Sequence, residues 1–448
     1  MMMWSKKKEE SESEEESDGS ETVESGPKIS MIPSILKDTA CTINPSKPIG
    51  LRLSQEGWVN SVQVGTFAER SNVRIGTRVV RVQTSRGWNM IESINELKHA
   101  IKNSKNFGDE ELVVVLSGIL KGEMKWQGGV KAPNGLIYGI PSNTKEVLCL
   151  NPTQEIVTTF GQLEPYDEIS QSNDYSDSGL WFNGVYSKST NKIYGIPFNA
   201  SQFIEIDPML NTVKRISNII LMGKNKWRGG VSDMYGRIHC IPADSNSVIM
   251  YDPKLLKWEI YGNLIAQGSN KWYDGCYCKN DDRILAIPFD ADCILMIDPE
   301  YKVTSLLFEN DILLKGYGKW SGGVVTPNDD CIYCIPYNAT FVLKIDPKAR
   351  TLLKLEGELK GYGKWNGGVL APDGCIYGIP YQAETLLKIN PMTQEVSTVG
   401  SVHATKGRIG LWRGGVLGDD GNVYGIPCDS PAVLKLDTYV APSDEDFE

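Results

Sequence analysis

The chain has 448 residues, 41% of them hydrophobic, which is typical of two or three globular domains. It contains no run of about 18 apolar residues, so no membrane-spanning helix is predicted. The net charge of −10 lies in the tails, because residues 1–27 carry −6 and residues 441–448 carry −4. The remainder is near neutral, which argues against nucleic-acid binding through a strongly basic surface.

Residues 1–27 consist largely of Ser, Glu and Lys, and such a segment buries too little apolar surface to fold. We expect a disordered acidic tail there and a second acidic tail at 441–448. No apolar run follows the lysines Lys6–Lys8, so no secretory signal is expected and the predicted location is the cytoplasm. The ten cysteines are then expected to be reduced.

Residues 28–118 form a separate α+β unit in which short strands surround one amphipathic helix. The helix begins at a capping box, in which Ser93 precedes Glu96 by three residues, and an apolar stripe follows. The segments with strand patterns are Leu51–Leu53, Val59–Val64, Arg78–Val82 and Leu112–Leu116.

The segment Pro48-Ile49-Gly50-Leu51, the stretch Val64–Ala68 and the helix that ends at Asn103 follow one another in an order that resembles a PDZ domain. The resemblance implies that backbone N–H groups around Gly50 bind a peptide's terminal carboxylate. It also implies that Leu51–Leu53 pairs with the peptide as an added strand, and that Ile94 selects a hydrophobic ligand residue. The alternative is a PDZ-like module that only packs on its neighbour. The candidate peptide-binding residues are Lys47, Pro48, Ile49, Gly50, Leu51, Arg52, Leu53, Ile94, Lys98 and Ile101.

Residues 119–440 contain seven copies of one sequence repeat, and the clearest copy is residues 364–391. Each copy has Trp followed by a small-residue strand, a polar turn, an Ile-Tyr-Gly-Ile-Pro strand, a Val-Leu-Lys-Ile-Asp strand and an Asp-Pro turn before a fourth strand. Four short strands in each copy of about 45 residues predict a β-propeller blade. The copies begin at Trp126, Trp181, Trp227, Trp272, Trp320, Trp365 and Trp412.

Seven copies predict a seven-bladed ring, and the blades resemble kelch-like and related propeller repeats. The third copy is the most similar, because Tyr251-Asp252-Pro253 is followed by Trp258. The same alignment explains Cys331 and Cys334, which fall on two independent repeat positions, so no metal site or other cofactor is expected.

The seventh copy ends before a fourth strand, which leaves three ways to complete the ring. Residues 112–117 stay with the PDZ-like unit and the last blade has three strands; residues 111–120 complete the blade; or residues 28–45 do so. The first is preferred, because one strand does not easily serve two sheets.

The Trp and Gly-Gly positions are interpreted as packing, and the positions that vary on this fixed frame are the better binding candidates. The residues after Trp are Gln127, Phe182, Arg228, Tyr273, Ser321, Asn366 and Arg413, and those after Ile-Pro are Ser142, Phe198, Ala243, Phe289, Tyr337, Tyr381 and Cys428. These side chains either form an arc on one face or cover blade edges. The candidates for a propeller binding face are Phe198, Phe289, Tyr337, Tyr381, Arg228, Tyr273 and Arg413.

A lysine also recurs just before Trp, at Lys125, Lys226, Lys271, Lys319 and Lys364. These lysines are expected to be solvated, with a basic ring as the alternative.

The sequence favours a protein-interaction adaptor, in which the PDZ-like unit binds C-terminal or internal peptide segments and the propeller binds a second protein. None of the common nucleophile, zinc, phosphate or dinucleotide motifs is present. The alternatives are a propeller enzyme, a hydrolase or lyase whose PDZ-like unit recruits substrate, and a sugar-binding propeller that uses its aromatic residues.

Overall fold

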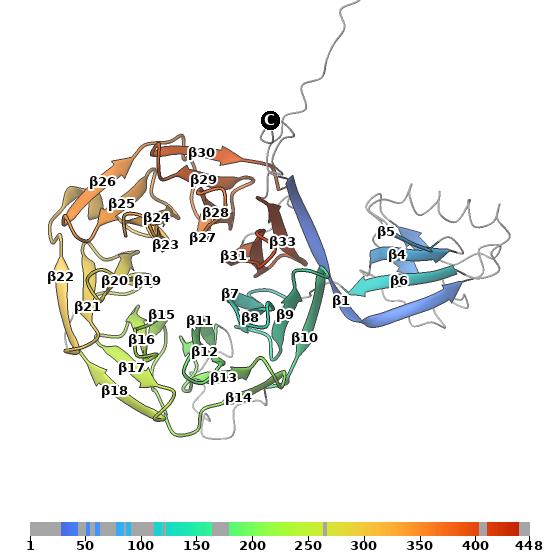
Figure 1. Ribbon diagram of the computed structural model, residues 1–448, viewed down its shortest axis with the longest axis horizontal. Coiled ribbons are helices and arrows are strands. Elements are labelled where there is room, and N and C mark those ends of the chain that lie inside the picture. Colours follow the sequence, from blue (N-terminus) through green and yellow to red (C-terminus); the bar gives the residue numbers. More distant parts are fainter. Residues whose placement is uncertain are drawn as a thin grey trace, which may run out of the picture.

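The computed structural model describes residues 28–43, 51–53, 59–62, 78–84, 87–90, 112–118, 120, 122–163, 179–262, 267–402 and 410–438. The predicted acidic tails lie outside these ranges. Within them the fold is mainly β, and the predicted seven-bladed propeller is confirmed, with seven blades arranged as a ring (Figure 1). In the described part of the chain, no helix has the length and apolar character needed to cross a membrane.

Each of the first four blades has four antiparallel strands that follow the chain from the axis outward (Figure 1). Blade one has β7 (Trp126–Lys131), β8 (Ile137–Pro141), β9 (Val147–Asn151) and β10 (Ile156–Phe160). Blade two has β11 (Trp181–Ser187), β12 (Lys192–Pro197), β13 (Ile204–Asp207) and β14 (Thr212–Arg215). Blade three has β15 (Trp227–Ser232), β16 (Ile238–Pro242), β17 (Val248–Asp252) and β18 (Lys257–Tyr261). Blade four has β19 (Trp272–Cys278), β20 (Arg283–Pro288), β21 (Ile294–Asp298) and β22 (Val303–Leu307).

The remaining blades continue this order, with a short 3-10 helix, η2 (Ile312–Leu314), before blade five. Blade five has β23 (Trp320–Val325), β24 (Ile332–Pro336), β25 (Val342–Asp346) and β26 (Thr351–Leu355). Blade six has β27 (Trp365–Leu370), β28 (Ile376–Pro380), β29 (Leu386–Asn390) and β30 (Glu395–Val399). Blade seven contributes β31 (Trp412–Leu417), β32 (Val423–Pro427) and β33 (Ala432–Asp437).

The fourth strand of blade seven comes from the other end of the chain. Lys28–Pro33, the first part of β1 (Lys28–Ile43), pairs antiparallel with Asp437–Ala432. Our preference for a three-stranded last blade was therefore wrong, and the third alternative describes the ring closure. The physical reason is that the exposed edge of β33 would otherwise remain unpaired. Ile32 is buried there, between blades seven and one.

The second part of β1 belongs to a smaller sheet, which Figure 1 shows beside the ring. There Thr39–Ile43 pairs with β6 (Leu112–Gly118), β6 pairs with β4 (Arg78–Thr84), and β4 pairs with β5 (Gly87–Met90). A separate hairpin joins β2 (Leu51–Leu53) to β3 (Val59–Val62). β6 thus stays with the N-terminal sheet, while β1 is divided along its length between the two sheets.

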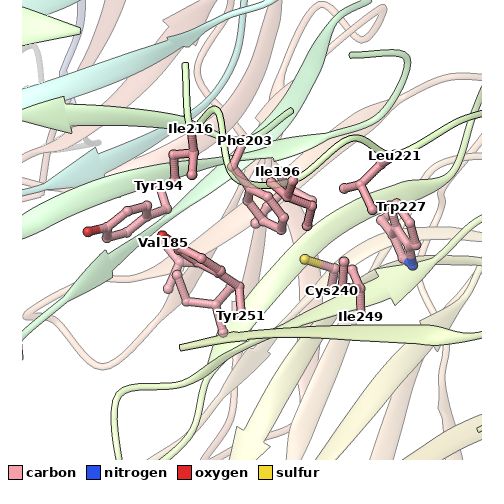
Figure 2. Packing of buried hydrophobic residues seen from close by; sticks show 12 residues of the cluster. Val185, Tyr194, Ile196, Phe203, Ile216, Leu221, Trp227, Cys240, Ile249 and Tyr251 are labelled. Atoms are coloured by element: carbon pink, nitrogen blue, oxygen red, sulfur yellow. The ribbon is translucent and has the colours of Figure 1, made fainter. Parts of the chain in front are cut away.

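The core of the propeller lies between the blades. Each of the seven interfaces between neighbouring blades contains its own cluster of buried apolar side chains. Figure 2 shows the one between blades two and three, where Phe203 and Ile196 face Trp227 and Tyr251. Since burying one such side chain contributes roughly 1.5–3 kcal/mol, the hydrophobic stabilisation is spread around the ring.

The repeated Trp holds each blade to its neighbour in the same way every time. Each of the seven indoles is almost fully buried, and its Nε1 donates a hydrogen bond of 2.7 to 3.2 Å to a backbone carbonyl at the start of the third strand of its own blade. A buried polar N–H needs such a partner, and every copy of the repeat supplies one.

The turn chemistry also follows the repeat. In the turn between the third and fourth strands, the carboxylate of Asp298 accepts hydrogen bonds from the backbone N–H groups of Glu300 and Tyr301. Asp252 does the same in blade three, where it accepts from Lys254 and Leu255. The prediction that the Asp of Asp-Pro caps this turn is confirmed.

Candidate binding face of the propeller

Most of the predicted peptide-binding residues lie outside the described residues. These are Lys47, Pro48, Ile49, Gly50, Ile94, Lys98 and Ile101. Leu51, Arg52 and Leu53 form β2, whose one described partner strand is β3, with Leu51 opposite Val62. The peptide groove remains a prediction.

At the end of the propeller where every first strand begins with Trp, a closed belt of backbone hydrogen bonds runs around the ring. We call this end the Trp end. The residue before each Trp donates its N–H to the carbonyl of the residue after Ile-Pro in the preceding blade, at 2.9 to 3.2 Å. It also accepts the N–H of the residue after Ile-Pro in its own blade, at 2.8 to 3.0 Å. All seven blades repeat both bonds, so the belt fixes the backbone at the positions that vary most between copies.

The recurring lysines reinforce this belt, and the expectation that they are solvated was wrong. Lys125, Lys226, Lys271, Lys319 and Lys364 are only 2 to 4% exposed. Their Nζ atoms donate to backbone carbonyls, as Lys226 does to Phe198 at 3.0 Å and to Gly223 at 2.7 Å. Burial lowers the pKa of Lys226 to about 7 and that of Lys364 to about 8. The alternative of a solvent-facing basic ring is wrong for the same reason.

The belt positions two sets of side chains that meet around the axis. The residues after Trp reach across the ring: Asn366 Nδ2 of blade six donates to Tyr273 Oη of blade four at 2.7 Å. Phe182 of blade two packs edge-on against Tyr273, with ring centroids 5.4 Å apart. Both contacts skip a blade, so side chains of non-neighbouring blades meet at this level.

The aromatic candidates form one unbroken chain of ring contacts from blade two to blade six. Centroid separations are 5.3 Å for Phe182–Phe198, 5.5 Å for Tyr273–Phe289, 5.4 Å for Phe289–Tyr337 and 5.6 Å for Tyr337–Tyr381. Such tilted pairs at this spacing are mutually stabilising. The sequence left two alternatives, an arc on one face or a cover for the blade edges. These ring contacts form an arc.

Arg228 stands inside this arc. Its Cζ lies 5.0 Å from the ring centroid of Phe182, 4.9 Å from Phe198, 5.0 Å from Tyr273 and 5.6 Å from Phe289. A guanidinium among aromatic rings is held by cation–π attraction. Burial, together with the nearby charge of Arg413, lowers the pKa of Arg228. Its Nε is buried and has no acceptor among the described residues.

Arg413 is held differently, since its two Nη atoms are both hydrogen-bonded. Nη1 donates to Gln127 Oε1 and Nη2 donates to Tyr381 Oη, each at 2.7 Å. Its Cζ lies 4.6 Å from the Tyr381 ring and 5.5 Å from the Phe182 ring. We refer to these two arginines and the aromatic arc as the axial cluster, which comprises Phe182, Phe198, Arg228, Tyr273, Phe289, Tyr337, Tyr381 and Arg413. Arg228, Phe289, Tyr337 and Arg413 are half-buried, and the others are buried.

One residue further along each first strand, the backbones of neighbouring blades approach one another closely around the axis. Five of the seven residues there are glycines, and a Cβ on Gly414 would lie 3.0 Å from the Cα of Gly128. Blades two and four instead have Asn183 and Asp274, both at positive φ, and Asn183 Nδ2 donates to Asp274 Oδ2 at 2.7 Å. Burial raises the pKa of Asp274 from 3.8 to about 6, against its hydrogen bonds from Gly275 and Asn183.

Asn183 and Asp274 were not among the candidates drawn from the sequence. The sequence did contain a signal, because only these two copies replace the first glycine of Trp-x-Gly-Gly. A polar residue at a glycine position near a crowded axis suggests a specific role for that side chain.

Comparison with known proteins identifies the fold and no family. No protein-family model and no curated protein sequence matches this chain. Among solved structures, a streptogramin B lyase is similar at 10% identity with a TM-score of 0.55, covering 71% of this chain and 95% of that one. Virginiamycin B lyase from Staphylococcus aureus, a catalytically inactive variant with quinupristin, gives 11% identity and a TM-score of 0.56, with 72% and 98% covered.

Other solved structures are similar with slightly lower TM-scores. The WD40 β-propeller domain of Doa1 has 11% identity and a TM-score of 0.50, over 73% of this chain and 96% of that one. A chain of the mitotic checkpoint complex has 8% identity and a TM-score of 0.52, over 71% and 89%. At such identities the likeness shows the propeller fold alone.

Proposed function

We propose that this protein is a cytoplasmic interaction scaffold whose propeller binds a partner protein at the Trp end, through the axial cluster. The observation that carries this proposal is the composition of the cluster: six aromatic rings and two arginines, collected from six blades at a layer where the repeat varies. Aromatic residues and Arg dominate the energetics of protein–protein interfaces. The half-exposed members, Arg228, Phe289, Tyr337 and Arg413, are the ones a partner would contact.

The N-terminal unit supplies the second contact in this proposal. A PDZ-like groove between Leu51–Leu53 and the predicted helix would bind a hydrophobic peptide C-terminus, with the carboxylate at Gly50. Since β1 pairs with both the small sheet and blade seven, the two binding units are joined by one continuous strand. The similarity of the blades to kelch-like repeats belongs to the same proposal, and it is supported by the likeness to a chain that is part of the mitotic checkpoint complex.

The test is affinity purification of the full chain with one variant for each contact. Tyr337→Ala removes a half-buried ring from the axial cluster, and Gly50→Glu places a side chain and a charge at the predicted carboxylate loop. Tyr301→Ala, which removes a 76% exposed ring from an outer turn of blade four, is the matched control. We expect Tyr337→Ala and Gly50→Glu to lose different partners and Tyr301→Ala to lose none. If all three variants retain every partner, the scaffold proposal is wrong.

A lyase is the second candidate, and Asp274 is the observation that favours it. A half-buried carboxyl at the axis whose pKa is raised to about 6 is the kind of group that general acid–base catalysis uses. The one histidine within the described residues, His239, is buried in blade three and does not reach the axis. Incubation of the protein with quinupristin, followed by mass spectrometry, separates the candidates: a changed product mass that Asp274→Asn abolishes would support the lyase.

A further inference from the structure

Arg228 has cationic nitrogen atoms that nothing in the described protein uses. No hydrogen bond or ion pair connects its guanidinium to any described residue, and its contacts are the four aromatic rings. A guanidinium carries five N–H donors, and leaving such donors unpaired costs free energy. The rings hold the group in place and provide no acceptor oxygen. The guanidinium of Arg228 is therefore held in place, but its N–H donors have no hydrogen-bond acceptor among the described residues.

The pattern of burial indicates the direction from which an acceptor could approach. Nε is fully buried and lacks a partner, whereas the two Nη atoms also lack protein partners and are not fully buried. A ligand cannot use the Nε side of the fork, because the rings enclose it. The accessible approach is end-on, to the two Nη atoms, which is one of the geometries in which Arg binds an oxyanion through two parallel hydrogen bonds.

The charges around Arg228 favour an anion as the missing partner. Arg413 is close enough to lower the pKa of Arg228, and its own Nη atoms are engaged by Gln127 and Tyr381. The carboxylates of Asp244 and Asp290 attract Arg228, and no ion pair joins either of them to it. Each of them already accepts a backbone N–H, from Asn270 and from Gly318. Neither carboxylate forms an ion pair with Arg228, so its two Nη atoms still lack the acceptor that an anionic ligand would supply.

We propose that Arg228 is an anion-binding residue that receives an acidic side chain of a bound peptide, a carboxylate or a phosphate, end-on between its two Nη atoms. The aromatic rings of Phe289 and Tyr337 then contact the neighbouring part of the peptide. This inference rests on the proposed function, since it names the chemistry of the partner segment that the axial cluster binds. It assigns to Arg413 a supporting role, in which its charge also attracts the anion and its hydrogen bonds keep Tyr381 in place.

The experiment is a binding assay on the full chain with three matched sets of randomised peptides, whose central residue is glutamate, glutamine or phosphoserine. Charge-assisted hydrogen bonds to a guanidinium are stronger than neutral ones, so we expect an acidic set to bind about tenfold more protein than the glutamine set. Preference for the glutamate set identifies a carboxylate site, and preference for the phosphoserine set identifies a phosphate site. Equal binding of all three sets would overturn the proposal.

Variants connect that preference to Arg228. Arg228→Gln should bind all three sets equally, and Arg228→Lys, which keeps the charge but loses the fork, should keep only part of the preference. Arg350→Gln, at an exposed turn of blade five, should behave as the wild type. An acidic preference that persists in Arg228→Gln would assign the site to another residue. If Arg228→Gln does not fold, Arg228→Lys and the loss of the wild-type preference at raised salt still decide the question.

The outcomes separate this inference from the proposed function. If Tyr337→Ala loses partners while wild type shows no acidic preference, the scaffold stands and the anion site is wrong. If the acidic preference follows Arg228 while Tyr337→Ala, Gly50→Glu and Tyr301→Ala all retain every partner, the anion site stands and the scaffold is wrong.

Discussion

Two neighbouring positions on the first strand of every blade have opposite characters. The Trp is the same in all seven copies and makes the same hydrogen bond in each. The next residue is Gln, Phe, Arg, Tyr, Ser, Asn or Arg, and it turns to the axis instead of the interface between blades. Since successive side chains of a strand point to opposite sides, one residue of displacement separates the frame of this propeller from its candidate binding surface.

A repeat protein can vary one surface in this way without disturbing its fold. The belt of backbone hydrogen bonds at the Trp end uses N–H and carbonyl groups, which every residue other than proline offers. The side chains that it positions are therefore free to change from copy to copy. Stability should respond strongly to changes at Trp and weakly at the axial cluster, and binding should do the reverse.

The largest expected effect is the loss of a frame Trp. Trp320 is 0% exposed, and Trp320→Ala should lower the free energy of unfolding by about 3–5 kcal/mol, because it opens a cavity between blades four and five and removes the bond to Phe341. The matched control is Trp258→Ala on outer strand β18, where the side chain is 42% exposed and the loss should be below about 1 kcal/mol. Urea unfolding of both variants checks this, and equal losses would contradict the distinction.

A second effect concerns His239, which replaces the Tyr of most other copies in the second strand. Its Nε2 lies 3.0 Å from Asp233 Oδ2 and its Nδ1 lies 2.7 Å from Tyr261 Oη. Because a carboxylate only accepts, Nε2 carries the proton and Nδ1 accepts from the tyrosine. Burial lowers the pKa of His239, so the neutral form is favoured in the folded state.

The sign of the pH effect follows directly. A base whose pKa is lowered by folding contributes stability above its ordinary value of 6.5, and this stability is lost as the pH falls below that value. His239→Gln keeps a donor and an acceptor but does not titrate. At neutral pH the substitution should lower the free energy of unfolding by about 2 kcal/mol through lost packing. As the pH falls to about 5, the stability of the variant should decrease less than that of the wild type. Parallel curves of melting temperature against pH would contradict this role.

Asp274 should show the opposite dependence. Because folding raises its pKa from 3.8 to about 6, the stability it contributes is fully present below 3.8 and is lost as the pH rises through about 6. Asp274→Asn should remove about 1–2 kcal/mol of this loss, so the variant's stability should be flatter than the wild type's between these pH values. Thermal unfolding of the two proteins across that range measures the difference. A variant that keeps the wild-type slope would show that another group titrates there.

The smallest effect on stability belongs to the axial cluster. Tyr381→Phe removes the hydroxyl that accepts from Arg413 Nη2 and keeps the ring. We expect a loss of about 1 kcal/mol in unfolding free energy and a several-fold loss in capture of the partners that Tyr337→Ala also loses. If Tyr381→Phe lowered the free energy of unfolding as much as Trp320→Ala does, Tyr381 would have a mainly structural role.

The fold could be predicted because the same pattern of strands and turns occurs in all seven copies of the repeat. The Trp, the turn residues and the strand pattern carry the blade count and the strand order, and the structure agrees with them. Ring closure was not predictable in the same way. Lys28–Pro33 contains no repeat motif, and its place beside β33 depends on an edge that exists only after the ring has formed.

The candidate site was predictable as a set of positions and not as an arrangement. Aligning the copies singled out Arg228 and Tyr273, but no alignment shows that Phe182 reaches across a blade to Tyr273. The lysines show a similar limit. Their recurrence was visible, whereas their burial depends on carbonyl groups of loops such as Gly223 and Gly316, which contact them only in the folded ring.

The division of β1 between two sheets has a consequence for biosynthesis. Lys28–Pro33 leaves the ribosome about 400 residues before Ala432–Asp437, the strand on which it closes the ring. At about 5–20 residues per second, translation leaves this segment without its partner for about 20–80 s. During that time β1 and the growing propeller both present unpaired edges, and the apolar side chain of Ile32 has no interface in which to be buried. The nascent chain is therefore most open to aggregation, and to chaperones, until its last blade is made.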